Sequence, residues 1–288
     1  MLPDYLTNYS ELDLMLRFPF PADPEPVFLD VGAFRGGFTR AFAKRGWRVL
    51  AFEPDARNYD LCVRRNQQYP RVSCINKAVS ENTGVFRYLY VTENHPARNS
   101  IVQTGSIQKR GDLVETIRLD DAVEEYGLDR VNLLKIDTEG ADFICLKTFN
   151  FSRYRPELVM VEFYDRRSLP HLGYTHHDMV AFLVPYGYRA YVSELGPLDW
   201  TGSPRQIGVS EYKFEEISAY PLDHEPEHGN LIFVKDTLVD PFESTRKEYL
   251  SDLKRYRSFR VPINLLRNLF VRIPFSMETY YLLRRLFL

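Results

Sequence analysis

The sequence has few cysteines, no long hydrophobic run and no excess of positive charge. Its cysteines form no Cys-x-x-Cys pair, which argues against a disulfide framework and indicates a reducing compartment. No apolar run reaches the roughly 18 residues that cross a bilayer, and the first residues lack a basic leader before an apolar core, so we expect no secretory signal. A net charge of −2 offers no basic face for nucleic acid. These absences predict a cytoplasmic protein that binds no nucleic acid.

Strand and helix patterns alternate along most of the chain from Val27 onward. The apolar runs predict strands at 27–31, 48–54, 72–79, 84–92, 115–119, 131–136, 157–164, 188–193 and 229–236. The last two are expected to pair antiparallel and close the sheet. Helical patterns fall between most of the others, as in "GGFTRAFAKRG" and "ARNYDLCVRRNQQY". This rhythm predicts an α/β fold with a doubly wound, mainly parallel sheet and an antiparallel closing strand.

Three parts of the chain differ in character. Residues 1–26 are expected to be a helical lead-in that ends in the rigid linker "PADPEP", and 27–240 to be the main domain. Residues 241–288 predict a basic amphipathic helical extension, since 245–288 hold ten Lys or Arg and three Asp or Glu. This extension would either contact a membrane surface peripherally or pack back on the domain or on a second subunit.

The most informative stretch is "VFLDVGAFRGGFT", a predicted strand followed by a glycine-rich turn and a helix. A dinucleotide fold needs Gly-x-Gly-x-x-Gly at this place, because the backbone must approach a pyrophosphate. Here Phe34 stands where the second glycine is needed, and the Gly-Lys-Ser/Thr of a phosphate-binding loop is absent as well. The loop therefore disfavours ligands that bind through phosphate.

Two acids flank this turn at the ends of neighbouring predicted strands. Asp30 is placed where it could pair with a cationic amino group, and Glu53 where it could accept both hydroxyls of a ribose. A ligand with a ribose, an adenine and an amino-acid tail but no phosphate fits this pattern, and S-adenosylmethionine is such a ligand. An NAD(P)-dependent oxidoreductase or epimerase is the alternative, because such enzymes also place an acid after the second strand.

The segments "FLDVGAFRGGFT", "AFEPDARNYDLCVRRN", "NKAVSENTG", "IRLDDAV", "LLKIDTEGADFICLK" and "PELVMVEFY" resemble the FkbM family of methyltransferases, in the family's order and over roughly residues 27–165. The resemblance implies a class I methyltransferase fold that uses S-adenosylmethionine, leaves S-adenosylhomocysteine, and methylates a hydroxyl of a sugar, a glycan or glycolipid precursor, or a natural product. The cofactor-binding residues that it implies are Asp30, Gly32, Ala33, Gly36, Glu53, Pro54, Ala78, Val79 and Asp137.

A hydroxyl acceptor needs a base as the new bond forms. The candidate catalytic residues are Asp137, Glu162 and His176, of which the first two end apolar strands at the same predicted edge of the sheet. We expect no metal; the alternative is one Mg²⁺ held by Asp137, Glu162 and Asp165. Lys135 is given a structural role. A binding or scaffold module that keeps the fold without catalysis stays open as a second class of function.

Overall fold

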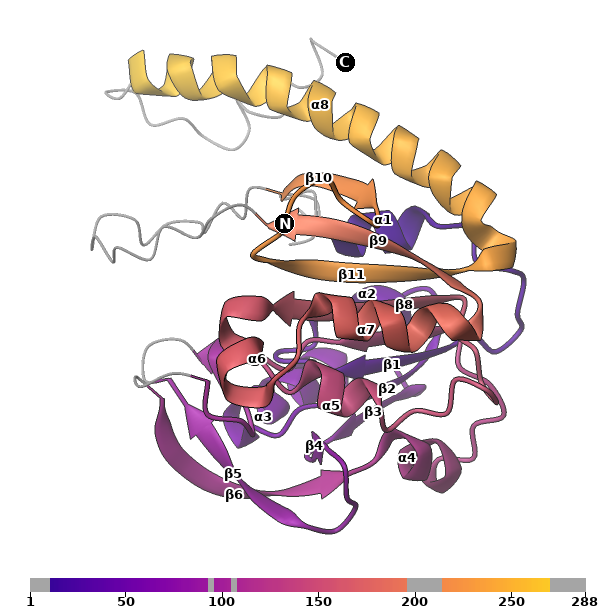
Figure 1. The fold of residues 1–288 in the computed structure, drawn as a ribbon, viewed down its shortest axis with the longest axis vertical. Coiled ribbons are helices and arrows are strands. Elements are labelled where there is room, and N and C mark those ends of the chain that lie inside the picture. The colour runs from indigo at the N-terminus through magenta and orange to yellow at the C-terminus, as the bar shows by residue number, and fades with distance from the viewer. Residues whose placement is uncertain (1–10, 93–95, 105–107, 196–213, 270–288) are drawn as a thin grey trace. The chain divides into compact units, whose positions relative to one another are not determined.

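The computed structural model describes residues 11–92, 96–104, 108–195 and 214–269 (Figure 1). The chain divides into two compact units, 1–246 and 247–288. The first is built on an eight-stranded sheet with the order β10-β9-β11-β8-β7-β1-β2-β3. Its strands are β1 (Val27–Val31), β2 (Arg48–Phe52), β3 (Val72–Ile75), β7 (Leu133–Ile136), β8 (Leu158–Tyr164), β9 (Tyr188–Leu195), β10 (Phe214–Ala219) and β11 (His228–Lys235).

The middle of this sheet is parallel and one side of it is antiparallel. β3, β2, β1, β7 and β8 run in the same direction, and β11 is inserted antiparallel between β8 and β9. The predicted doubly wound, mainly parallel sheet with an antiparallel closing strand is confirmed. Because β1, β2, β7 and β8 point the same way, the loops that follow them gather at one edge, where ligands of such sheets bind.

Helices cover both faces of the sheet (Figure 1). They are α1 (Glu11–Arg17), α2 (Gly37–Ala43), α3 (Ala56–Asn66), α4 (Leu119–Glu125), α5 (Asp142–Leu146), α6 (Asp165–Leu172) and α7 (His176–Leu183), with 3-10 turns at η2 (Pro96–Arg98), η3 (Val184–Tyr186) and η5 (Asp236–Leu238). Successive residues of β1 face opposite layers. Phe28 contacts Phe42 of α2 at 4.9 Å between ring centroids, whereas Leu29 belongs to the core cluster that includes residues of α4, α5 and α7.

A smaller sheet of three strands, β4 (Ala78–Val79), β6 (Lys109–Ile117) and β5 (Phe86–Val91), flanks the main one. The single strand expected over 72–79 is wrong, because this segment contributes β3 to one sheet and β4 to the other. The side chain of Asn76 explains the break: its Nδ2 donates to the backbone oxygens of Glu53 at 2.9 Å and Pro54 at 3.0 Å. These bonds turn the chain away from the main sheet.

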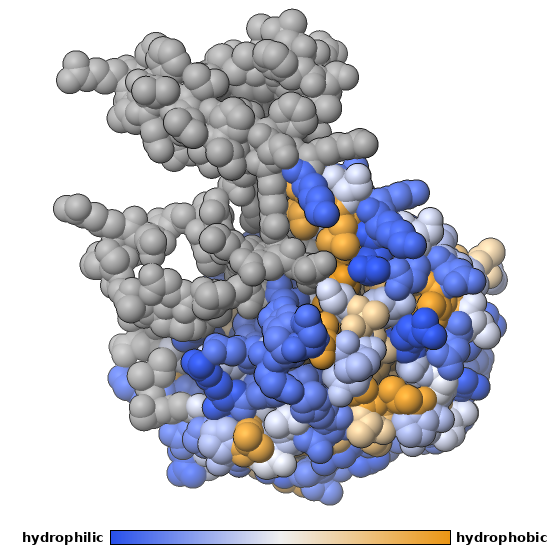
Figure 2. All heavy atoms as spheres, turned by 45° about the horizontal axis from the view of Figure 1, so that its top comes forward, coloured by the Kyte–Doolittle hydropathy of each residue, from blue (hydrophilic) through white to orange (hydrophobic). Residues whose placement is uncertain are grey.

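The C-terminal helix α8 (Val239–Leu269) begins in the first unit and continues into the second. In the first unit Phe242 is fully buried and lies 4.6 Å from the Tyr191 ring, and Arg246 donates to the Ile217 oxygen at 2.7 Å. No helix among the described residues is apolar over the length that a membrane crossing requires. On the face shown in Figure 2, apolar residues form small separate patches among hydrophilic ones, without a broad apolar surface.

Gly32 determines how closely the loop after β1 approaches the end of β7. Its φ is +73°, and a Cβ on this residue would lie 1.8 Å from the backbone oxygen of Asp137. The backbone nitrogens of Gly32 and Ala33 both donate to the Phe52 oxygen of β2, at 3.0 and 2.9 Å. The ends of three neighbouring strands are thereby joined at this one residue.

We expect Gly32→Ala to lower the free energy of unfolding by more than about 3 kcal/mol, because the new methyl group overlaps backbone that cannot move away. Gly46→Ala is the matched control: its φ is +83°, but a Cβ there meets nothing within 4 Å, so only about 1 kcal/mol of backbone strain is expected. Urea denaturation followed by circular dichroism measures both. Equal losses would contradict the role given to the Asp137 contact.

Candidate active site

A buried ammonium group lies under the glycine-rich loop. Lys135 of β7 is the register partner of Asp30 in β1, and its Nζ lies 3.5 Å from Asp30 Oδ1 and 3.3 Å from Asp137 Oδ2. The same Nζ donates to the Gly32 oxygen at 3.3 Å. Burial acts to lower the pKa of Lys135, but the charges of Asp137 and Asp30 outweigh it and the pKa is raised. Lys135 therefore stays positively charged and holds two carboxylates and the loop together.

Asp30 faces α2 and is fully buried. Its Oδ2 accepts from the Thr39 nitrogen at 3.1 Å and from Thr39 Oγ1 at 2.6 Å. Its Oδ1 accepts no hydrogen bond from the described residues and has Lys135 as its ionic partner. Asp30 is therefore engaged with Lys135 and Thr39, and its expected pairing with an amino group of a ligand stays a prediction.

Glu53 follows β2 and supports the same loop from the other side. Its Oε2 accepts from the Phe34 nitrogen at 2.8 Å, and its Oε1 accepts from the Asp55 nitrogen at 2.9 Å. Burial raises the pKa of Glu53 to about 8. Phe34 has a φ of +51°, so its apolar side chain is accommodated in a left-handed turn while its N–H makes the polar contact. The expected contact of Glu53 with the hydroxyls of a ribose stays a prediction.

The turn after β7 is held by the carboxylate of Asp142, which begins α5. Its Oδ1 accepts from the Thr138 nitrogen at 2.7 Å and Thr138 Oγ1 at 2.9 Å, and its Oδ2 accepts from the Gly140 nitrogen at 2.9 Å. Burial raises the pKa of Asp142 to about 6. Glu139 sits between these anchored residues with a φ of +57°. The turn is therefore fixed in a strained conformation that sets the direction of Glu139.

Three carboxylates meet at the carboxyl edge of the sheet. Asp137, Glu139 and Glu162 of β8, called the acidic triad below, each place one oxygen within 4.8 Å of the others. Arg167 Nη1 lies 2.7 Å from Glu139 Oε2, and Lys135 is the partner of Asp137. Burial, followed by the charge of Asp137, raises the pKa of Glu139 to about 7.

Glu162 is the most perturbed member of the acidic triad. Burial, and then the charge of Glu139, raises its pKa well above the ordinary value. Its Oε1 lies 3.2 Å from Nε2 of His228, and burial together with the charge of Arg167 lowers the pKa of His228 to about 4. Near pH 7 the imidazole is therefore neutral, while the raised pKa makes the Glu162 carboxylate a better proton acceptor than an exposed glutamate.

Asp165 and His176 lie in a different group from the acidic triad. The structure brings Glu139, and not the expected Asp165, to Asp137 and Glu162. Asp165 instead places Oδ2 at 2.6 Å from His176 Nδ1 and accepts from the His176 nitrogen at 2.9 Å. In the alternative Mg²⁺ site, Asp165 is therefore wrong, and Glu139 takes its place beside Asp137 and Glu162. His176 is 1% exposed and grouped with His177, so its expected part in catalysis stays a prediction.

The other expected cofactor residues surround the loop. A Cβ on Gly36 would lie 2.4 Å from Asn66 Nδ2 and 2.8 Å from Cys62 Sγ, so this glycine lets the loop pack on α3. Ala33 packs with Cys62 in a small apolar cluster. Pro54, Ala78 and Val79 were also expected to line the site. In the structure the Pro54 oxygen accepts a hydrogen bond from Asn76, and Ala78 and Val79 are the buried residues of β4.

The segment before β6 closes over these loops. Ser100 Oγ donates to the Thr138 oxygen at 2.8 Å, and Asn99 Nδ2 donates to Asp55 Oδ2 at 3.0 Å. Tyr174 contributes from the other side, where its OH donates to the Gly140 oxygen at 2.7 Å. These hydrogen bonds tie Ser100 and Tyr174 to the turn that carries Glu139, while the side chain of Asp137 stays 38% exposed.

Four charged or polar residues of the site were not assigned to it from the sequence: Lys135, Asp142, Arg167 and His228. One signal was available, because Lys135 and Asp137 stand two residues apart at the end of one strand and so face the same side. Arg167 lies on α6, whose sequence "DRRSLPHL" has little apolar pattern and contains Pro170. Nothing local in the sequence indicates that this helix reaches Glu139.

Comparison with known proteins places this geometry in a family. Residues 30–190 match the model of the methyltransferase FkbM domain. The chain is 30% identical over 156 residues to the methyltransferase sdnD of Sordaria araneosa, covering 42% of this chain and 60% of that one. It is 27% identical over 134 residues to the 2-O-methyltransferase NoeI of Sinorhizobium fredii (strain NBRC 101917 / NGR234), covering 41% and 55%. It therefore spans somewhat more than half the length of these relatives. A solved precorrin-6y C5,15-methyltransferase of Geobacter metallireducens GS-15 is 14% identical, with a TM-score of 0.39 over 81% of this chain and 93% of that one.

We expect Lys135→Met to lower the free energy of unfolding by about 3–5 kcal/mol, since Asp30 would be left as an unpaired buried charge. Adding Asp30→Asn should recover part of the loss, because the charge itself is then removed. Lys77→Met is the control: its ion pair with Glu115, at 2.9 Å on the surface, should be worth about 1 kcal/mol or less. Urea denaturation of the unaltered protein, Lys135→Met, Asp30→Asn and the double variant measures the coupling between the two residues. If the two single losses simply add in the double variant, Lys135 and Asp30 are not coupled.

Proposed function

The chain belongs to the methyltransferase FkbM family, and from this premise we propose that it transfers a methyl group from S-adenosylmethionine to a hydroxyl of a sugar, a glycan or glycolipid precursor, or a related natural product. The observation that carries the proposal is the acidic triad, at the carboxyl edge of the sheet and beside the glycine-rich loop.

The charge of this edge supports a cationic ligand. Two of the three carboxylates of the acidic triad have Lys135 and Arg167 as partners, while Glu162 contacts the neutral imidazole of His228. A positively charged sulfur would be attracted to such a group, whereas the anionic pyrophosphate of NAD(P) would be repelled. This favours S-adenosylmethionine over the oxidoreductase alternative.

The residues present fit this cofactor. The two free lone pairs of Glu53 suit the two hydroxyls of a ribose, and Asp30 Oδ1 is a buried acceptor without a hydrogen bond from the described residues. When bound, S-adenosylmethionine supplies a methyl group on a sulfonium. The protein's part is to orient the acceptor, to keep water out and to take up the proton that the hydroxyl loses.

We assign the base to Glu162. It lies two residues before the end of β8 and beside Asp137, and its raised pKa makes its carboxylate a stronger proton acceptor than an exposed glutamate. His228 contacts Oε1 and so fixes the direction of the carboxyl group. Mg²⁺ is less favoured in this place, because Lys135 and Arg167 already occupy the positions from which a cation would neutralise Asp137 and Glu139.

The acceptor class is proposed from one relative and from the chemistry of the site. The name of NoeI describes a 2-O-methyltransferase, and a proton-accepting carboxyl group suits an alcohol better than a carbon or sulfur nucleophile. The basic extension over 245–288 remains proposed as a contact surface for a membrane or a second subunit; residues 270–288 of it lie outside the described structure. A scaffold without catalysis is the second candidate, and cofactor binding without transfer would favour it.

Calorimetric titration should detect binding of S-adenosylmethionine and S-adenosylhomocysteine and none of NAD⁺. Glu53→Ala is expected to weaken binding by about 10- to 100-fold, the effect of losing two hydrogen bonds to a buried carboxyl group. Glu124→Ala, an exposed acid on α4, should leave affinity unchanged. Unaltered affinity in Glu53→Ala would remove the ribose assignment, and binding of NAD⁺ alone would favour the oxidoreductase.

Transfer of labelled methyl groups to a panel of saccharide and glycolipid acceptors tests the base. We expect Glu162→Gln to lower kcat by about 10²- to 10⁴-fold with little effect on cofactor affinity. In the unaltered protein, kcat/KM should rise with pH over a range above that of an exposed glutamate, since only the ionised carboxylate accepts a proton and burial raises the pKa of Glu162. Glu227→Gln, an exposed acid before β11, is the control. A pH profile that is unchanged in Glu162→Gln would assign the base elsewhere.

A further inference from the structure

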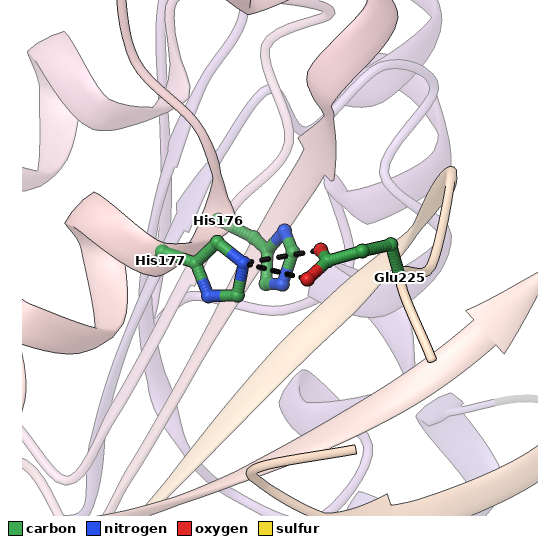
Figure 3. A group of neighbouring side chains, drawn as sticks. All are labelled: His176, His177 and Glu225. Atoms are coloured by element: carbon green, nitrogen blue, oxygen red, sulfur yellow. Dashed lines mark hydrogen bonds and ion pairs between the residues drawn. The ribbon is translucent and has the colours of Figure 1, made fainter. Parts of the chain in front are cut away.

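A group of side chains that carry metal-ligand atoms lies outside the acidic triad. His176 and His177 are the first two residues of α7, and Glu225 belongs to the segment between β10 and β11. Each offers one nitrogen or oxygen within 4.8 Å of the others. Figure 3 shows both imidazole rings beside the Glu225 carboxylate, and the ring centroids of the two histidines are 3.9 Å apart.

Each histidine is oriented by a hydrogen bond at its Nδ1. His176 Nδ1 lies 2.6 Å from Asp165 Oδ2, a pure acceptor when ionised, so Nδ1 carries the proton and Nε2 keeps its lone pair. His177 Nδ1 lies 2.8 Å from the Tyr220 hydroxyl, and its Nε2 is 3.1 Å from Glu225 Oε2. Metal-binding histidines are typically held in this way, with an oxygen partner on the nitrogen that does not bind the ion.

We propose that His176 Nε2, His177 Nε2 and the Glu225 carboxylate bind one Zn²⁺ ion, with water as the fourth ligand. Two imidazoles and a carboxylate are a ligand set that suits Zn²⁺, whereas Mg²⁺ prefers oxygen alone. Bonds of about 2.0–2.2 Å in a tetrahedron bring ligand atoms to about 3.3 Å from one another. The ligand atoms can come together to this distance by movement of His177 and Glu225, whose side chains are 48% and 76% exposed, while the buried His176 stays in place.

The ion would connect two parts of the chain that lie next to Glu162 and its contact His228. Asp165 directly follows β8, which carries Glu162, and His228, the contact of Glu162, begins β11 three residues after Glu225. Zn²⁺ would therefore tie the segment before β11 to the start of α7. This role does not depend on methyl transfer, and the proposal concerns metal binding alone.

The test uses the full chain, freed of any affinity tag and treated with a chelator. Zn²⁺ is titrated in competition with a chromophoric chelator, and Co²⁺ serves as a probe because its visible absorption becomes intense in a tetrahedral site. We expect one ion per chain. His177→Ala and Glu225→Gln should each weaken Zn²⁺ binding at least about tenfold. Asp165→Asn alters only the hydrogen-bond partner of His176 Nδ1 and should weaken Zn²⁺ binding by about 10- to 100-fold.

Two variants serve as controls, and circular dichroism checks that every variant is folded. His171→Ala removes an exposed histidine of the neighbouring α6 and should change nothing. Glu139→Gln removes one member of the acidic triad and should also leave Zn²⁺ affinity unchanged. Equal affinity of the unaltered protein, His177→Ala and Glu225→Gln would overturn the proposal, and so would a loss confined to Glu139→Gln. Neither result depends on whether the protein transfers a methyl group.

Discussion

The buried ammonium of Lys135 is the interaction on which the arrangement of the site depends. A charged side chain that is 3% exposed is costly unless its partners surround it, and here it lies among two carboxylates and the Gly32 oxygen. Because those partners come from β1, the loop after it and the end of β7, one cation fixes the relative positions of three segments.

Strain is concentrated in the loops that Lys135 joins. Phe34 and Glu139 are non-glycine residues with positive φ, each a conformation that costs on the order of 1 kcal/mol. In both cases a buried carboxylate supports the turn: Glu53 accepts from Phe34 itself, and Asp142 accepts from the neighbours of Glu139. The hydrogen bonds offset the strain and fix the backbone before any ligand arrives.

The sequence predicts this architecture well where a pattern is local. Apolar runs identified the parallel strands of the main sheet and the antiparallel pair β9 and β11, whereas the edge strand β10 was missed. Patterns failed where a single side chain overrides them, as Asn76 does by dividing one expected strand between two sheets. The acids at strand ends were visible, but their partners were not. Arg167 comes from a helix with a weak apolar pattern, and the pairing of Lys135 with Asp30 depends on strand register.

The contact of Gly32 with Asp137 has a consequence for protein engineering and for divergence within the family. The glycine-rich loop and the turn after β7, about one hundred residues apart, meet at a surface with no room for a methyl group. Gly36 likewise leaves little room between the loop and α3. The glycine-rich loop and the turn after β7 therefore act as one structural unit rather than as separate motifs. A chimera that takes the glycine-rich loop from one relative and the turn after β7 from another would join surfaces shaped for different partners, so new acceptor specificities are better sought in the outer loops.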